Sequence, residues 1–398
     1  MTDLESLRRV GSADVYKAGR LAASINRTSV GGTEFAYVPG YAGEPVASTL
    51  PVGTAVVRNE SGSLPPFFAG LLPEGHRLTV LRRAVKTSAD DELSLLLAVG
   101  SDVPGDVQVI PVGEELADGP ALADCASAED LDFDRLIDDV DRQAIPGVQN
   151  KASASMISTP VAAGFGRFIL KLSQSGFPHL IENEAAHLSA ARVMKLPVAK
   201  ADLVNDRGGR PGLLVRRFDR TYENEGWQRL AFEDATQVLG LPPSAKYNID
   251  AVDVVAAVAG IAGAPLVAVR NLYLQYLFAW LTGNGDLHGK NIGVLRDVVG
   301  RWEIAPIYDI PCTLIYGDES MALPIAGRTK NLRVKHWLDF ASEIGLPRRA
   351  AVSAQRLALR ASATVDFERL PFSGSPRNRA VRELRLRRAE LEQSFESC

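Results

Sequence analysis

The spacing of hydrophobic and polar residues differs between the two halves of the chain. In the first hundred or so residues, short apolar runs are broken by Gly and Pro. The runs at residues 35–38, 54–58 and 107–111 predict strands, whereas those at 78–82 and 92–97 predict helices. We therefore expect a small α+β unit at the N-terminal end.

The pattern becomes helical further along. Residues 166–172 alternate as a strand does, and 212–216 predicts another strand. Between them, Glu182 to Met194 carries apolar residues three apart, which predicts a helix. From about Glu233 the pattern is mainly helical, and residues 271–281 are apolar and aromatic enough to predict a core helix. Strands followed by helices are typical of a strand-rich lobe joined to a helical lobe, so the predicted class is α+β.

Length and charge suggest where the domains divide. At roughly 100–200 residues per domain, a chain of 398 residues predicts two or three domains. Eight acidic residues lie among positions 114–134, which predicts an exposed connector. We expect an α+β subdomain at 1–112, the acidic connector at 113–134, the rest of the N-lobe at 135–222 and a helical C-lobe at 223–398.

Composition excludes several classes of protein. Hydrophobic residues make up 46% and charged residues 23%, which suits a globular core and excludes disorder, collagen or coiled coil for the whole chain. The net charge of −4 is unlike that of a dedicated nucleic-acid binder, which is usually basic. Cys125, Cys312 and Cys398 lie too far apart for a disulfide framework or a metal motif, which fits a reducing compartment.

The sequence also predicts a cytoplasmic protein without membrane contact. The N-terminal residues carry charges where a signal peptide needs an apolar stretch. The most apolar stretch, Val252 to Val269, is interrupted by Asp253 and Pro265, so it predicts a buried helix that runs into a turn.

The densest cluster of polar residues is Thr282 to Asn291, between the predicted core helix and a predicted strand at 292–295. Asp286 and Asn291 are five positions apart, the spacing of the protein-kinase catalytic loop. In that loop the Asp orients or deprotonates the acceptor hydroxyl and the Asn holds Mg²⁺. Eighteen residues later, Asp309 lies inside an apolar run, where burial is costly unless the carboxylate is paired or binds a metal. Asp309 is therefore a candidate second Mg²⁺ ligand.

A lysine suited to nucleotide phosphates lies upstream. Lys171 is flanked by apolar residues in the strand at 166–172, the position of the phosphate-binding lysine in kinases. Glu182 or Glu184 on the next helix is a candidate partner for it, and both alternatives stay open. Gly147 allows close backbone approach in a loop where Gln149 and Lys151 are candidate phosphate donors, a weak signal by itself.

Seven motifs together resemble one family. In chain order they are Phe67–Gly75 (FFAGLLPEG), Gly147–Lys151 (GVQNK), Phe168–Lys171 (FILK), Val215–Arg220 (VRRFDR), Glu233–Tyr247 (EDATQVLGLPPSAKY), Gly283–Asn291 (GNGDLHGKN) and Tyr308-Asp309. The chain resembles HipA-type toxins, the serine/threonine kinase half of type II toxin–antitoxin pairs. The resemblance extends from about residue 10 to about residue 340 and implies a kinase-like fold of two lobes.

The resemblance implies a role for each candidate residue. Lys171 would bind the phosphates of ATP, Asp286 would be the catalytic Asp, and Asn291 and Asp309 would hold Mg²⁺. The remaining implied roles are a phosphate-side loop at Gly147, Gln149 and Lys151, a hinge against adenine at Arg216 and Phe218, a ribose contact at Asp219, and shaping of the catalytic loop by His288 and Lys290.

The resemblance also implies partners. The family phosphorylates aminoacyl-tRNA synthetases, chiefly the glutamyl enzyme, which stops translation and causes growth arrest and persistence. Its antitoxin, HipB, is a helix-turn-helix protein that brings the kinase to operator DNA and represses their shared operon.

The sequence departs from the family at two places. Relatives often carry a Ser three residues before the loop Gly, and its self-phosphorylation switches the kinase off. Here Ala144 occupies that position and has no hydroxyl, although Ser153 and Ser155 follow the loop. The hinge begins with Arg216-Arg217 where an acidic residue is common, a change that leaves backbone contacts to adenine intact.

Two other functions compete with the toxin kinase. One is a small-molecule phosphotransferase on a related fold, and the other is a corepressor without activity. The family motifs favour a protein kinase, and the presence of all four of Lys171, Asp286, Asn291 and Asp309 speaks against a dead enzyme. Clustered arginines near the C-terminus are candidate DNA contacts, although interleaved glutamates also suit a solvated helix face. They are Arg377, Arg379, Arg382, Arg385, Arg387 and Arg388.

Overall fold

A computed structural model describes residues 4–116, 130–133, 157–163, 166–173, 176–223 and 226–396. The predicted phosphate-side loop with Gly147, Gln149 and Lys151, as well as Ala144 and most of the acidic connector, lie outside these described residues. The proposed division of the chain at residues 112, 134 and 222 therefore stays a prediction.

The N-terminal domain, residues 4–111, is built on an antiparallel sheet of five strands in the order β4-β3-β2-β1-β5. The strands are β1 (Ser12–Lys17), β2 (Arg20–Arg27), β3 (Thr33–Tyr37), β4 (Val57–Asn59) and β5 (Val107–Pro111). The helices are α1 (Pro66–Gly70), α2 (Gly75–Val85) and α3 (Glu92–Val99), with 3₁₀ turns η1 (Leu4–Arg9) and η2 (Gly100–Asp102). Apolar residues of the sheet pack against α1 and α3 in one core. The predicted strand at 54–58 is observed only from Val57 onward, and the one predicted at 35–38 extends one residue beyond β3. The predicted elements at 78–82, 92–97 and 107–111 lie within observed ones.

A second antiparallel sheet of four strands, in the order β6-β7-β9-β8, carries the predicted lysine. Its strands are β6 (Ile157–Ala163), β7 (Gly166–Leu172), β8 (Ala201–Asn205) and β9 (Pro211–Arg216). Helix α5 (Leu180–Ala191), extended by η5 (Arg192–Met194), covers one face, where Leu180 and Ile181 pack on Leu213 and Val215. A hairpin of β10 (Arg220–Glu223) and β11 (Gly226–Arg229) leads to the next lobe.

The C-terminal lobe is mostly helical, as its pattern predicts. Its helices are α6 (Ala235–Val238), α7 (Ala251–Ile261), α8 (Pro265–Thr282), α9 (Val334–Glu343), α10 (Arg348–Ser362) and α11 (Gly374–Glu396). The 3₁₀ turns η6 (Pro243–Tyr247), η7 (Gly289–Asn291) and η8 (Leu314–Tyr316) accompany a small antiparallel sheet of β12 (Phe232–Asp234), β13 (Gly293–Arg296) and β14 (Trp302–Ile304). The stretch 252–269 contains a helix that ends at Ile261, and Pro265 then begins α8, where its missing N–H costs nothing.

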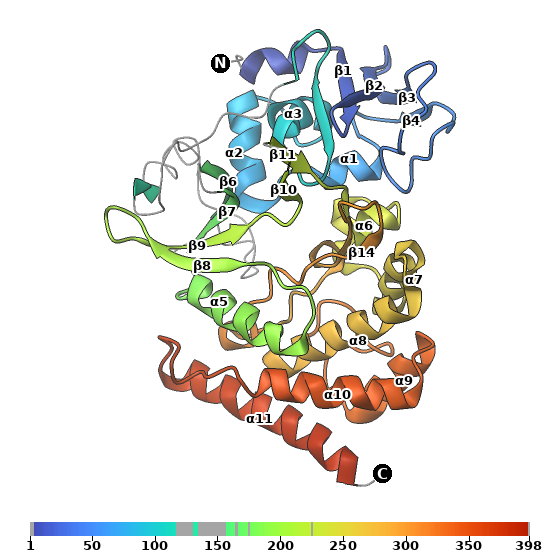
Figure 1. Ribbon diagram of the computed structural model, residues 1–398. Coiled ribbons are helices and arrows are strands. Elements are labelled where there is room, and N and C mark those ends of the chain that lie inside the picture. The colour runs from blue at the N-terminus through green and yellow to red at the C-terminus, as the bar shows by residue number, and fades with distance from the viewer. Residues whose placement is uncertain are drawn as a thin grey trace.

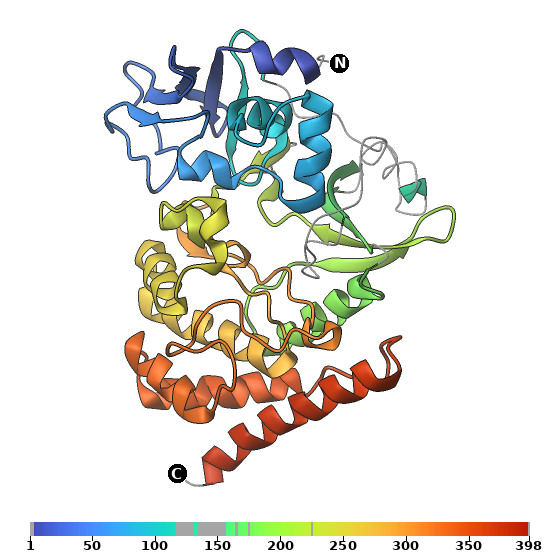
Figure 2. The same ribbon diagram turned by 180° about the vertical axis from the view of Figure 1, so that it is seen from behind.

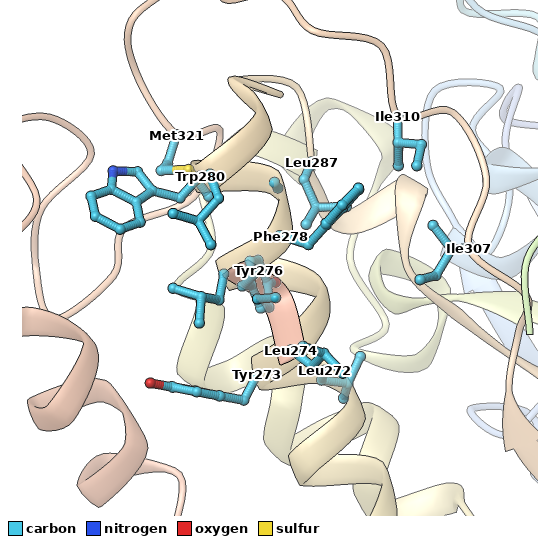
Figure 3. Packing of buried hydrophobic residues seen from close by; sticks show 14 of the residues in the cluster. Leu272, Tyr273, Leu274, Tyr276, Phe278, Trp280, Leu287, Ile307, Ile310 and Met321 are labelled. Atoms are coloured by element: carbon cyan, nitrogen blue, oxygen red, sulfur yellow. The ribbon is translucent and has the colours of Figure 1, made fainter. Parts of the chain in front are cut away.

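Helix α8 is the centre of the largest core. Almost its whole C-terminal half is buried, and Figure 3 shows Tyr276, Phe278 and Leu287 among the side chains of this cluster. Burial of residues 272–282 holds the C-terminal half of α8 in place, so the loop that follows it starts from a defined position. Within the described part of the chain, none of the helices combines the length and apolar character needed to cross a bilayer.

The N-terminal domain lies at one end of the molecule, and α10 and α11 lie at the other (Figures 1 and 2). The four-stranded sheet lies at one side of the molecule, at a level between these two ends. The strand-rich part and the helical lobe meet where β7, α5, the loop after α8 and the segment after β14 converge. The fold is α+β, as predicted.

Candidate active site

The loop after α8 is held by its own polar groups. Gly283 ends the helix with φ 73°, a left-handed conformation, and a Cβ there would lie 2.8 Å from the Leu314 Cβ. The Asp286 N–H donates to Asn284 Oδ1 at 2.9 Å, and the Asn291 amide nitrogen donates to the Asp286 carbonyl oxygen at 2.9 Å. Asp286 and Asn291 are both buried, so the predicted loop is a fixed structure rather than a solvated connection.

The carboxylate of Asp286 has a partner that sequence analysis missed. The Tyr247 hydroxyl donates to Asp286 Oδ1 at 2.7 Å. Burial and the Asp286 charge raise the pKa of Tyr247, which keeps its proton on the phenol. The sequence did contain a signal, because the Lys246-Tyr247 pair belongs to a motif of the family, but nothing in the spacing linked it to Asp286.

Lys171 lies between two carboxylates from different elements. Its ammonium group is 2.8 and 2.9 Å from the two oxygens of Glu184 on α5, and 3.0 Å from Asp309 Oδ1. Of the two glutamates left open by the sequence, Glu184 is the partner, while Glu182 lies 3.7 Å from His179. Burial would lower the pKa of Lys171, but Asp309 and Glu184 outweigh it and raise the pKa, so Lys171 is charged.

Asp309 is held in an unusual conformation beside Lys171. Its φ of 54° is left-handed, which L-residues other than Gly adopt rarely and Asn or Asp adopt most easily. Burial would raise the pKa of Asp309, yet the charge and hydrogen bond of Lys171 lower it, so the carboxylate is ionised. A negatively charged carboxylate, a type of group that binds metal ions, therefore lies next to Lys171.

Asn291 and Asp309 suit a hard divalent cation. The hydrogen bond from the Asn291 amide nitrogen leaves the amide oxygen as the atom available to a ligand, and Asp309 offers a carboxylate. Among the described residues, no group of three or more His, Cys, Asp or Glu side chains forms a metal centre. Mg²⁺ is commonly held by one or two such oxygen donors together with substrate phosphates, so this pair fits it.

A cavity of about 350 Å³ lies next to this charge cluster, a size within the usual range of ligand pockets. Lys171 and Glu184 border it, and its apolar walls include Ile169, Val215 and Phe232. Arg216 and Phe218, the predicted hinge residues, line it too, as does Tyr308, whose ring lies 5.5 Å from that of Phe218. A cavity of this size with apolar and aromatic walls suits the adenine ring of a nucleotide.

Asp219 also borders the cavity, but its oxygens are engaged elsewhere. Arg217 Nη2 lies 2.9 Å and Arg220 Nη1 2.7 Å from Asp219 Oδ2, and the Gly105 N–H donates to the same oxygen at 2.8 Å. Asp102 joins both arginines at 2.8 and 3.0 Å. These contacts give Asp219 a clear structural role between the domains, whereas its contact with ribose stays a prediction.

His288 and Lys290 contact other protein groups. The His288 Nδ1 accepts from the Lys290 N–H at 3.2 Å, and its ring meets the Tyr247 ring edge-on with centroids 4.9 Å apart. The Lys290 ammonium donates to the Gly70 carbonyl oxygen at 2.7 Å, and the Tyr308 hydroxyl donates to the Lys290 carbonyl oxygen at 2.5 Å. Both residues therefore brace the loop, and their part in the chemistry stays a prediction.

Known proteins resemble this chain along most of its length. Y4mE of Sinorhizobium fredii, whose name describes it as a kinase, is 29% identical in an alignment 366 positions long that covers 84% of this chain and 86% of its own. The serine/threonine-protein kinase toxin HipA of Shewanella oneidensis is 28% identical in an alignment 344 positions long that covers 78% of this chain and 77% of its own.

A solved structure shares the fold. It is a chain of the toxin–antitoxin system of Shewanella oneidensis MR-1, in the complex of HipA, HipB and operator DNA. Its TM-score is 0.76 at 20% identity, over 96% of this chain and 97% of that one. Two family models also match: the HipA N-terminal domain at residues 13–110, and the HipA-like C-terminal domain at residues 143–365, more than half of the chain. The chain therefore belongs to the HipA family.

Proposed function

We propose that this protein is an ATP-dependent serine/threonine protein kinase that acts in the cytoplasm as the toxin of a toxin–antitoxin pair. The observation that carries the proposal is the contact of Lys171 with both Glu184 and Asp309 beside a nucleotide-sized cavity. Relatives that share most of the chain bear the names of kinases, and one of them is a serine/threonine kinase toxin.

The reaction would use each group in turn. Lys171 would neutralise phosphate oxygens of ATP, and Asn291 and Asp309 would hold Mg²⁺, which supplies further charge neutralisation when bound. Asp286 would orient the acceptor hydroxyl and take its proton. The hydroxyl oxygen would bond to the γ-phosphorus as the bond to the β–γ bridging oxygen breaks, and ADP would leave. Gly147, Gln149 and Lys151 would cover the phosphates, and Arg216, Phe218 and Asp219 would contact the nucleoside.

The partners follow from the family. We propose a helix-turn-helix antitoxin like HipB, operator DNA reached through that antitoxin with repression of the shared operon, and an aminoacyl-tRNA synthetase, with the glutamyl enzyme favoured, as substrate. The HipA structure from Shewanella oneidensis was solved with HipB and operator DNA.

Five of the six C-terminal arginines divide into two groups with respect to DNA. Arg379 pairs with Glu319, Arg387 pairs with Glu383 at 2.9 Å, and Arg388 donates to the Ser362 carbonyl oxygen at 2.9 Å. Arg382 and Arg385 are exposed on α11, so they are the better candidates for phosphate contacts.

Expression in a bacterial host tests the proposed function. Expression of the wild type alone should arrest growth, Asp286→Asn should not, and co-expression of the antitoxin should relieve the arrest. Normal growth and normal levels of charged tRNA during expression of the active protein would contradict the toxin function.

A further inference from the structure

The segment Phe67–Glu74 of the N-terminal domain reaches the loop that carries Asp286. The Lys290 ammonium donates to the Gly70 carbonyl oxygen at 2.7 Å and lies 3.5 Å from Glu74 Oε1. The second Glu74 oxygen forms an ion pair with Lys246. One carboxylate of the N-terminal domain thus binds two lysines of the C-terminal lobe, Lys246 in η6 and Lys290 in the catalytic loop itself.

The charge state of Glu74 matches this bridge. Burial would raise the pKa of Glu74, but Lys290 and Lys246 outweigh it, and the pKa is lowered. Lys290 also lies 3.6 Å from Asp234. The ammonium groups of Lys246 and Lys290 therefore both lie close to carboxylates, and Glu74 is the carboxylate that pairs with both.

Lys246 in turn helps to hold the ring of Tyr247 in place. The Lys246 ammonium lies 5.2 Å from the centroid of the Tyr247 ring, and the His288 ring meets that ring edge-on. With its ring held by both, Tyr247 donates to Asp286 Oδ1 at 2.7 Å. That hydrogen bond fixes the orientation of the Asp286 carboxylate.

We propose that Glu74 is a positioning residue of the active site, which fixes the Asp286 carboxylate through Lys246 and Tyr247 and so makes the N-terminal domain part of the phosphotransfer machinery. The proposal rests on the proposed kinase function. Small displacements of a catalytic group are costly, because phosphotransfer depends mainly on alignment.

Glu74→Gln tests the link with little change in side-chain volume. We expect kcat to fall on the order of tenfold to a hundredfold, while the Kd of a non-hydrolysable ATP analogue stays within about twofold. Tyr247→Phe should lower kcat in the same way, and the double variant should be no slower than the slower single variant, because both changes break one linkage.

Glu44→Gln is the matched control. Glu44 also joins the N-terminal domain to the C-terminal lobe, through Arg296 at 3.1 Å, but it has no contact with the catalytic loop. It should leave kcat unchanged. Wild-type kcat in Glu74→Gln, or effects of Glu74→Gln and Tyr247→Phe that multiply in the double variant, would overturn the proposal.

Amide hydrogen exchange tests the positioning role of Glu74 without any measurement of kinase activity. Glu74→Gln should accelerate amide exchange in residues 283–291, whereas Glu44→Gln should not. Unchanged exchange in that segment would overturn the positioning role. If the wild type transfers no phosphate at all, the proposed function fails, and the exchange rates decide the positioning claim by themselves.

Discussion

Lys171 and Asp309 are 138 positions apart in the sequence, yet the lysine ammonium lies 3.0 Å from Asp309 Oδ1. The contact joins strand β7 to the segment after β14, so it crosses from the sheet lobe to the helical lobe. Glu184 completes the cluster from α5 with almost no exposure of its side chain. Lys171 therefore already has two carboxylate partners before any ligand binds.

Replacement of Lys171 distinguishes its contribution to folding stability from its contribution to ATP binding. Lys171→Met leaves the buried Glu184 carboxylate without its cation, so unfolding in urea should show a loss of about 3–5 kcal/mol. Binding of ATP should weaken as well. The double variant Lys171→Met/Glu184→Leu should recover part of the stability but none of the ATP binding. Full ATP affinity in either variant would refute the role of Lys171.

Asp286 and Asp309 should each be essential for phosphotransfer. Asp286→Asn and Asp309→Asn should reduce turnover about a thousandfold or more, since alignment and charge stabilisation supply most of the catalysis. Circular dichroism should remain that of the wild type, because both changes preserve side-chain shape. Turnover close to the wild-type rate in either variant would remove that residue from the mechanism.

The buried cluster around Asp219 should make the fold sensitive to acid. Burial would raise the pKa of Asp219, but Arg217 and Arg220 hold it well below its usual range. A carboxyl with a depressed folded-state pKa contributes stability above its unfolded pKa of about 3.9, and that stability is lost as pH falls toward the folded pKa.

Asp219→Asn tests this cluster. At neutral pH it should lose about 3–5 kcal/mol, because Asp102 is then the single carboxylate shared by the two buried arginines Arg217 and Arg220. Below about pH 4 its stability should fall less steeply than that of the wild type. Asp202, an exposed carboxylate, is the control, and Asp202→Asn should match the wild type. An equal acid slope for Asp219→Asn and the wild type would contradict the prediction.

The buried imidazole of His187 should make folding stability depend on pH in a second, less acidic range. Burial lowers the pKa of His187 to about 4 from its ordinary value of 6.5, and its ring nitrogen lies 2.8 Å from the Asn183 carbonyl oxygen. The unfolded state binds a proton first, so stability should fall as pH drops from 6.5 toward 4, by about 3 kcal/mol in all.

Urea denaturation at a series of pH values checks the prediction for His187. His187→Phe should flatten the curve in this range, since Phe does not titrate. His179, whose side chain is 40% exposed, supplies the control, and His179→Gln should keep the wild-type slope. An unaltered slope in His187→Phe would assign the effect to another group.

Self-phosphorylation should not silence this kinase at the position used by relatives. Residues 140–146 contain no Ser, Thr or Tyr, and Ala144 replaces the expected serine. Incubation with Mg-ATP followed by intact-mass measurement and peptide mapping should find no added phosphate, or one on Ser153 or Ser155. Rapid loss of activity that tracks phosphate on any other residue would contradict this expectation.

Local patterns predicted much of the fold and part of the site. The alternation of 166–172 placed Lys171 on the observed strand β7, and the Asp286 to Asn291 spacing identified a loop that the structure holds rigidly. Residues remote in sequence were harder to predict. The choice of Glu184 over Glu182 depends on which side of α5 faces the sheet, and Glu74 reaches Lys246 only after the domains pack. Asp219 is the opposite case. Its motif predicted a contact with ribose, but in the structure its carboxylate pairs with Arg217 and Arg220.

Transfer of labelled γ-phosphate from ATP to protein in a bacterial lysate tests the central claim most directly. With the purified wild type and Mg²⁺, a single strongly labelled protein band should appear, and mass spectrometry should locate the phosphate on a serine or threonine. The band should be absent with Asp286→Asn. Equal labelling by wild type and Asp286→Asn, or label only in small molecules, would contradict the assignment as a protein kinase.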